Sequence, residues 1–105
     1  MRWMETIKIQ SATGKEQITV NELIALAQKV QKSANGQVLR DAMVFCHASV
    51  PGYFALKLFW NTDTAQTRGS MIGLSLTQAL EAFGLVDRSV WIEISQTKGG
   101  KEDEQ

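Results

Sequence analysis

The chain has 105 residues, of which 44% are hydrophobic, and its 11 Lys and Arg residues balance its 11 Asp and Glu residues. This length fits one domain with its own core, and the balanced charge argues against nucleic acid or an anionic membrane as a partner. A single cysteine and a single histidine make an internal disulfide impossible and leave too few ligands for a typical zinc site, so neither a metal nor another cofactor is expected.

The first predicted element is a strand over residues 3–10, because its side chains alternate with period two. The more apolar face of this strand carries Trp3, Glu5, Ile7 and Ile9. Residues 11–17 are polar and include Gly14, so they are expected to form a loop.

A helix is predicted next, with Thr19 as its N-cap and Glu22 three positions later, the spacing of a capping box. Apolar residues then recur at helical spacing, namely Val20, Leu23, Ile24, Ala27 and Val30. The helix is expected to end after Lys32, before the stop signal Asn35-Gly36.

A hairpin is predicted from residues 41–49 and 53–61, which are rich in aromatic and β-branched side chains and flank Val50-Pro51-Gly52. Pro followed by Gly is typical of a type II turn, which splays a two-residue hairpin, so a longer or bulged connection is expected. The pairing register therefore stays open, and with it the face on which His47 lies.

A second helix is predicted from a capping box at Ser75, with an apolar stripe that ends at Phe83 and with Gly84 as the residue after the helix. The polar residues 61–70 before it predict a loop. Residues 69–74 are apolar but interrupted by two glycines, and they stay unassigned.

The last strand is predicted over residues 89–95, with Val90, Ile92 and Ile94 on the helix side and Trp91 on the other. Residues 98–105 have no apolar anchor and are expected to form a disordered tail, which leaves residues 1–97 as a single domain. The N-terminus lacks the apolar segment of a signal peptide, and nowhere do about 18 apolar residues run uninterrupted, so a cytoplasmic location without membrane contact is expected.

The order β-α-β-β-α-β predicts an α+β fold of the ferredoxin-like type: a four-stranded antiparallel sheet with two helices on one face. The other face is uncovered, yet it collects Met4, Phe59 and Trp91, together with Lys57 and Glu93. Met43, Phe45 and His47 join this face if the hairpin is bulged. An uncovered apolar face of this kind marks a partner or ligand surface, and we predict a homodimer paired through it.

The segment at residues 56–63, LKLFWNTD, is similar to the third-strand pattern of the antibiotic biosynthesis monooxygenase-like branch of the dimeric α+β barrel superfamily. The resemblance implies two sheets that pack face to face around a cavity. Members of the branch include cofactor-independent oxygenases of polycyclic aromatic and quinol substrates, haem-degrading enzymes and many chains without known activity. This chain departs from the pattern in having no histidine after the third strand and in carrying RGSMIG before its second helix.

Two residues are candidates for catalysis. His47 is a candidate general base, because its unperturbed pKa lies near neutrality; the alternative is a hydrogen-bonded histidine on a strand. The resemblance implies that Asn61 belongs to a substrate pocket with Trp60, although core packing at the strand end explains Trp60 equally well. Cys46 is expected to behave as a small hydrophobe, since neighbours on a strand point to opposite faces and cannot form a Cys-His pair.

Six residues are candidates for ligand binding or for the interface: Phe45, Lys57, Phe59, Trp60, Trp91 and Glu93. Lys57 and Glu93 either orient a ligand or form an ion pair at the rim of an interface. Residues 68–70 are an additional, weaker candidate, because glycine-spaced backbone N–H groups can bind phosphate, but their spacing matches no known phosphate loop.

Two functional classes remain open. The chain is either a cofactor-independent, monooxygenase-like enzyme acting on a small aromatic compound in the cavity of a homodimer, or a noncatalytic module for ligand binding or assembly. A cavity of a few hundred Å³ lined by His47, Lys57 or Asn61 favours the first class. Interdigitated Phe59 and Trp91 without a void favour the second.

Overall fold

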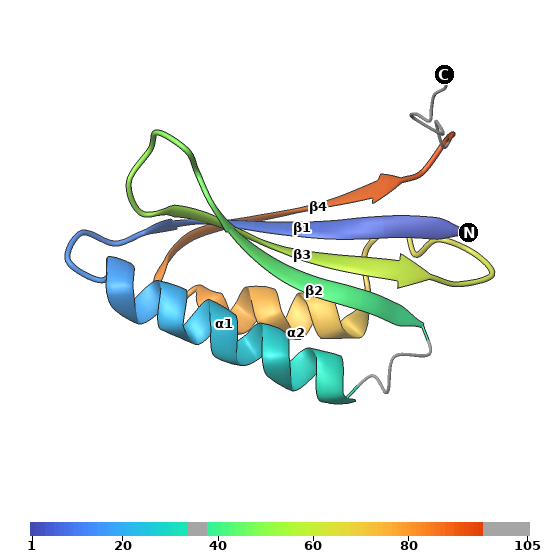
Figure 1. Ribbon diagram of the computed structural model, residues 1–105, viewed down its shortest axis with the longest axis horizontal. Helices are drawn as coiled ribbons and strands as arrows, with labels where there is room; N and C mark the ends of the chain where they lie inside the picture. Colours follow the sequence, from blue (N-terminus) through green and yellow to red (C-terminus); the bar gives the residue numbers. More distant parts are fainter. Residues whose placement is uncertain (34–37, 96–105) are drawn as a thin grey trace, which may run out of the picture.

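The fold was analysed in a computed structural model that describes residues 1–33 and 38–95. Its elements are β1 (Arg2–Ser11), α1 (Glu16–Ser33), β2 (Leu39–Cys46), β3 (Tyr53–Asn61), α2 (Met71–Leu80) and β4 (Gly84–Ile92). The strands form one antiparallel sheet in the order β2-β3-β1-β4, and both helices cover the same face of it (Figure 1). The predicted ferredoxin-like fold is confirmed.

The core lies between the sheet and the helices. The predicted alternation of β1 is confirmed, because Trp3, Glu5, Ile7 and Ile9 are all buried. Opposite them, β3 contributes Leu56, Leu58 and Trp60, and the helices contribute Leu23, Ala27, Val30, Leu76 and Leu80. The Trp3 and Trp60 rings stack with their centroids 5.5 Å apart and close the core at one end of the sheet.

The first helix begins earlier than predicted. Thr19 is not its N-cap but a buried residue inside α1, where its hydroxyl donates to the Lys15 carbonyl at 2.8 Å and meets Ser11 Oγ at 3.0 Å. The threonine thus ties the helix to the end of β1. Its side chain has a tertiary partner that local spacing could not reveal.

The second helix also begins earlier than predicted. Its N-cap is Ser70, whose hydroxyl accepts the Gly73 N–H at 2.9 Å, whereas Ser75 lies in the middle of α2. Gly84 does not follow a helix end but begins β4 opposite Ser11. A Cβ atom at Gly84 would lie 2.1 Å from the Gln10 carbonyl oxygen, so this close strand approach requires glycine. β4 therefore spans residues 84–92 rather than 89–95.

The register of β2 resolves which face the hairpin residues occupy. A bulge between Leu39 and Asp41 adds one residue to β2, after which Met43 pairs with Lys57 and Phe45 with Ala55. Through these pairings Met43 and Phe45 lie on the sheet surface that the helices do not cover, although the bulge lies at the end of β2 farthest from the hairpin connection. In β4 the predicted alternation holds for Val90 and Ile92, but Ile94 lies beyond the strand and is 98% exposed.

Two predictions cannot be compared with the fold. The stop signal Asn35-Gly36 and the polar tail over residues 98–105 lie outside the described residues. Within residues 1–33 and 38–95, neither helix is long and apolar enough to cross a membrane.

Candidate functional site

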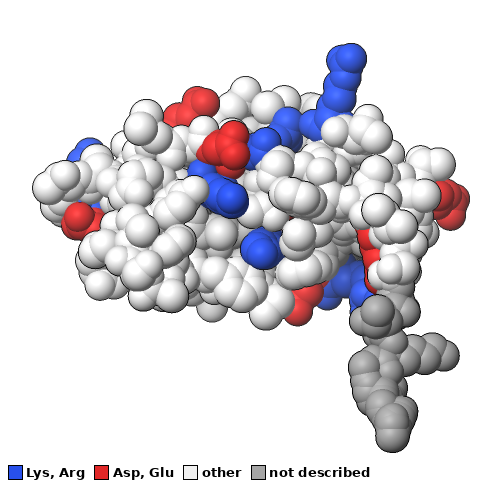
Figure 2. Space-filling view, turned by 90° about the horizontal axis from the view of Figure 1, so that it is seen from above, with Lys and Arg blue, Asp and Glu red and all other residues white. Residues whose placement is uncertain are grey.

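The open face, defined as the sheet surface opposite the helices, is the largest uncovered apolar surface of the described sheet. Its large apolar side chains are Met4, Met43, Phe45, Phe59, Leu85 and Trp91. Trp91 is 58% exposed, and Met43 and Phe45 are about 40% exposed. Figure 2 views the molecule from this side and shows mainly uncharged atoms, with a few Lys and Arg side chains and a few Asp and Glu side chains between them. Three hollows lie on this face, and Trp91 lines two of them.

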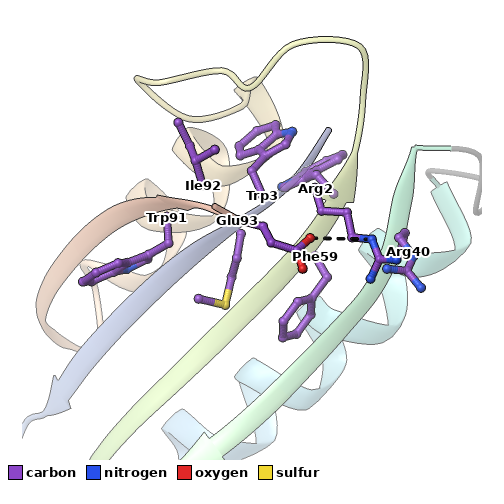
Figure 3. Close-up of a pocket in the computed structure, with 9 residues that line it drawn as sticks. Arg2, Trp3, Arg40, Phe59, Trp91, Ile92 and Glu93 are labelled. Carbon is purple, nitrogen blue, oxygen red and sulfur yellow. Dashed lines mark ion pairs between the residues drawn. The ribbon is translucent and has the colours of Figure 1, made fainter. Parts of the chain in front are cut away.

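The Arg2 hollow, of about 310 Å³, lies at the end of the sheet where β1 begins. Arg2 Nε lies 3.6 Å from Glu93 Oε1 at its edge, and Arg40 reaches the same edge from β2 (Figure 3). Phe59 and Trp91 form its apolar walls and project to the side of the sheet opposite Trp3 and Ile92. The hollow therefore has an apolar floor and a charged rim.

The Lys57 hollow, of about 440 Å³, lies farther along the same face. The residues that line it are Met4, Thr6, Lys8, Phe45, Cys46, His47, Tyr53, Phe54, Ala55, Lys57 and Trp91. The Lys57 ammonium lies 5.2 Å from the centre of the Phe45 ring, which is a cation–π contact. Trp91 and Met4 also line the Arg2 hollow, so the two hollows share a wall.

His47 lies at the end of the Lys57 hollow, just after β2. Its Nδ1 accepts the backbone N–H groups of Ser49 at 3.1 Å and Val50 at 3.0 Å, and its ring stacks on Tyr53. An imidazole whose Nδ1 accepts hydrogen bonds carries its proton on Nε2 when it is neutral. His47 thus caps the hairpin turn through Nδ1 and presents Nε2–H as a hydrogen-bond donor.

The two catalytic candidates lie far apart. His47 donates its backbone N–H to the carbonyl of Tyr53 at the start of β3, whereas Asn61 ends β3 beside Arg2. Asn61 lies eight residue steps along β3 from Tyr53, about 26 Å at 3.3 Å per residue. His47 and Asn61 therefore do not form one site within a single chain.

The remaining candidates divide between the two faces. Phe45 and Lys57 line one hollow, while Phe59 and Glu93 line the other, and Trp91 lines both. Trp60 is buried on the helix side, and its indole N–H donates to Glu5 Oε1 at 2.9 Å. Its place in the core matches the packing alternative.

A buried carboxylate is the feature that sequence reasoning missed. Glu5 is completely buried, and its Oε1 accepts from Trp60 and from Ser70 Oγ at 2.5 Å, while its Oε2 accepts the Ser70 N–H at 3.0 Å. Arg88 Nη1 lies 3.5 Å from Oε2. A Cβ atom on Gly73 would lie 2.0 Å from Oε2, so α2 can approach the carboxylate only with glycine there.

The Glu5 cluster, made of Glu5, Trp60, Ser70, Gly73 and Arg88, explains the unassigned segment at residues 69–74. The N-terminus of α2 favours an anion, because its backbone N–H groups lack helix partners. Here the anion comes from the chain itself, since Ser70 N–H donates to Glu5. The Glu5 carboxylate therefore occupies the position at which the backbone N–H groups of residues 68–70 were predicted to bind a phosphate. A glutamate within an otherwise apolar strand face, with glycines four residues apart near a helix start, was the available signal.

Metal binding finds no support within residues 1–33 and 38–95, where no group of three His, Cys, Asp or Glu side chains is placed to hold an ion. Cys46 is exposed at the rim of the Lys57 hollow and carries a free thiol. The side chains that line this hollow thus supply aromatic rings, two ammonium groups and hydrogen-bond donors.

No family model matches the chain, and no curated protein matches it. Solved structures do match. A "putative antibiotic biosynthesis monooxygenase" from Deinococcus radiodurans has 12% identity and a TM-score of 0.69, covering 90% of this chain and 95% of that one. Rv0793 from Mycobacterium tuberculosis has 13% identity and a TM-score of 0.67, covering 91% and 98%.

A further match is a structure described as an antibiotic biosynthesis monooxygenase, with 13% identity, a TM-score of 0.63 and coverage of 90% and 99%. At these identities the likeness shows the fold alone. The resemblance predicted from the third strand is therefore confirmed for the fold, over nearly the whole length of each chain.

Proposed function

We propose that the protein is a homodimer that pairs through the open face and encloses a chamber for a small aromatic compound. The observation that carries this proposal is the 58% exposure of Trp91 on a sheet face that also holds Phe45 and Met43. Burying one such side chain, rather than leaving it exposed to water, contributes about 1.5 to 3 kcal/mol of free energy. A two-fold axis lets the open face cover a second copy of itself.

Charge on the open face supports pairing with an identical copy. Lys8, Arg40 and Lys57 lie on the same surface as Asp87 and Glu93. A face that carries both signs can place cations of one copy near anions of the other, as isologous interfaces do. The hollows would then face into the space between the sheets.

The chamber suits a flat ligand. Aromatic side chains stack on flat rings, and the Lys57 hollow supplies Phe45, Tyr53 and Trp91 as walls. Polar groups at fixed positions orient a ligand in such a pocket, and Lys57 and His47 Nε2–H are available for that role. Binding is the activity that this geometry supports best.

Oxygenation of the bound compound is the second candidate function. It is favoured by the fold, which is shared with proteins described as antibiotic biosynthesis monooxygenases. His47 Nδ1 is engaged by the hairpin turn, so His47 would act as a donor to a substrate oxygen rather than as a base. Oxygen consumption with a panel of phenols and quinols, measured against protein-free controls, tests this candidate.

Size-exclusion chromatography with light scattering tests the homodimer at tens of micromolar protein. We expect twice the mass of the chain, and a monomer would overturn the proposal. Native mass spectrometry of protein from its own source would then show whether each dimer retains a small molecule. A dimer whose Phe59 and Trp91 side chains fill the hollows of the partner copy would instead be a noncatalytic assembly module.

A further inference from the structure

The Lys57 hollow has an unbalanced positive charge. No aspartate or glutamate is among the residues that line it. Lys57 has Thr6 and Met43 as its strand partners, so no acid opposes it, whereas the strand partner of Lys8 is Asp87. Within residues 1–33 and 38–95, neither lysine has a carboxylate within 4.0 Å. Lys57 is therefore a cation without a counter-ion on the floor of the hollow.

The same floor contains an unsatisfied hydroxyl. Among the described residues, Thr6 Oγ1 is the one buried side-chain nitrogen or oxygen without a hydrogen-bond partner, and Thr6 is only 3% exposed. Buried polar groups are almost always paired, and an unpaired one carries a desolvation cost. Thr6 lies on the central strand and lines the hollow beside Lys57.

An aromatic wall adjoins this hydroxyl. The Trp91 indole N–H donates to Ser89 Oγ at 2.9 Å, and Ser89 is the β4 partner of Thr6. Since the Ser89 hydroxyl accepts from the indole, it keeps Trp91 folded along the strand. Phe45 forms the opposite wall under the Lys57 ammonium. A cation, an unused hydrogen-bond donor and two aromatic rings thus meet on one patch.

We propose that the Lys57 hollow binds the carboxylate of a small aromatic acid. Lys57 would pair with one carboxylate oxygen and the Thr6 hydroxyl would donate to the other, while the ring lies between Phe45 and Trp91. Lys57 would turn from the Phe45 ring toward the carboxylate, beside its strand partner Thr6. The inference rests on the proposed function, because it names the ligand of that same chamber.

A carboxylate fits this patch better than a phenol does. Its two oxygens can accept from an ammonium and a hydroxyl at once, and charge-assisted hydrogen bonds are roughly twice as strong as neutral ones. A carboxylic acid is ionised at neutral pH, whereas a phenol with a pKa of about 10 is not. The volume of about 440 Å³ is ample for one substituted ring system.

Isothermal titration calorimetry with matched probes tests the inference on the wild-type chain. We expect 1-naphthoate to bind at least tenfold more tightly than 1-naphthamide, which has the same shape without the charge. Cyclohexanecarboxylate, which keeps the charge but lacks the aromatic ring, should bind more weakly than 1-naphthoate. Equal affinity for 1-naphthoate and 1-naphthamide would overturn the proposal, and so would the absence of 1-naphthoate binding at millimolar concentration.

Two variants locate the binding groups. Lys57→Met keeps the length of the side chain and should lower 1-naphthoate affinity at least tenfold while leaving 1-naphthamide unaffected, whereas Lys15→Met, at an exposed lysine on the helix side, should change neither. Thr6→Val removes the unpaired hydroxyl and should lower 1-naphthoate affinity about tenfold. Its thermal stability should be equal to or higher than that of the wild type, because the lost group has no partner.

The outcomes separate this inference from the proposed function. Wild-type affinity for 1-naphthoate in both folded variants would overturn the inference even if light scattering finds a dimer. A monomer that loses affinity in both variants would uphold the carboxylate site and overturn the homodimer. The same protein samples serve both measurements.

Discussion

Glu5 and Thr6 are neighbours on β1 and point to opposite faces of the sheet, and both are almost completely buried. On the helix side, the Glu5 carboxylate accepts three hydrogen bonds and lies beside Arg88. On the open face, the Thr6 hydroxyl has no partner. A charged group is fully satisfied on one face while a neutral one is left unpaired on the other. The polar groups of the Glu5 cluster are thus satisfied within the chain, whereas the Thr6 hydroxyl is the group that we propose a ligand satisfies.

Removing the Glu5 carboxylate should cause the largest loss of stability, because it would leave unpaired groups on the helix side of β1 as well. Glu5→Ala leaves Ser70 and the Trp60 N–H without their acceptor. It also removes the ion-pair partner of Arg88, which keeps two backbone carbonyls as acceptors, and breaking a buried pair costs about 3 to 5 kcal/mol. Chemical denaturation should show that loss in the free energy of unfolding. Glu81→Ala, at an exposed glutamate after α2, should stay within about 0.5 kcal/mol of the wild type. Equal stability of both variants would contradict a structural role for the Glu5 cluster.

A charge on the open face should abolish pairing without unfolding the chain. Trp91→Glu places two carboxylates near the proposed axis and removes a large apolar contact from each copy. Light scattering should then report a monomer with an unchanged circular dichroism spectrum. Ile24→Glu is the matched control, because Ile24 is 45% exposed on α1, on the helix side. If Trp91→Glu remained a dimer, the interface would have to lie elsewhere.

The start of α2 can be tested with two serines. Ser70→Ala removes both the N-cap acceptor for Gly73 and a hydrogen bond to Glu5, so it should lower the free energy of unfolding by about 1 to 2 kcal/mol. Ser75→Ala should be neutral or slightly stabilising, because alanine is the better helix former inside a helix. Denaturant melts that ranked the two variants in the reverse order would restore the predicted helix start.

His47 should have the smallest effect. His47→Ala removes an exposed acceptor of two turn N–H groups and should cost about 0.5 to 1.5 kcal/mol, with the oligomeric state unchanged. His47→Asn should recover part of this loss, because asparagine side chains cap turns in the same way. A loss of several kcal/mol would show that the hairpin end is far more important for stability than its exposure suggests.

The element order and the faces of the strands could be predicted from sequence because they depend on local periodicity. The alternation of β1 and the apolar spacing of α1 are of this kind. Helix starts could not be placed in the same way. Ser75 and Ser70 look alike locally, and only the fold brings Glu5 within 3.0 Å of Ser70 and thereby selects the earlier start.

The sequence predicted several residues of the candidate site, but it did not predict which of them lie close together. The face of Lys57 was predictable from the alternation of β3, whereas the face of Phe45, and with it their contact, depends on the pairing register of the hairpin, which no pattern fixed. Thr6 gave no signal, because a threonine among alternating residues is ordinary. Thr6 stands out because its buried hydroxyl has no hydrogen-bond partner, and only the three-dimensional structure shows which groups surround it.

The central position of β1 has a consequence for how the chain folds. β1 is synthesised before both of its partner strands, since it pairs with β3 from Tyr53 onward and with β4 from Gly84 onward. Both pairings close long loops, and such non-local contacts slow folding relative to helical proteins of similar length. The β2–β3 hairpin is the local part of the sheet and can form before β1 docks. A nascent chain must therefore keep β1 unpaired until β3 has also left the ribosome.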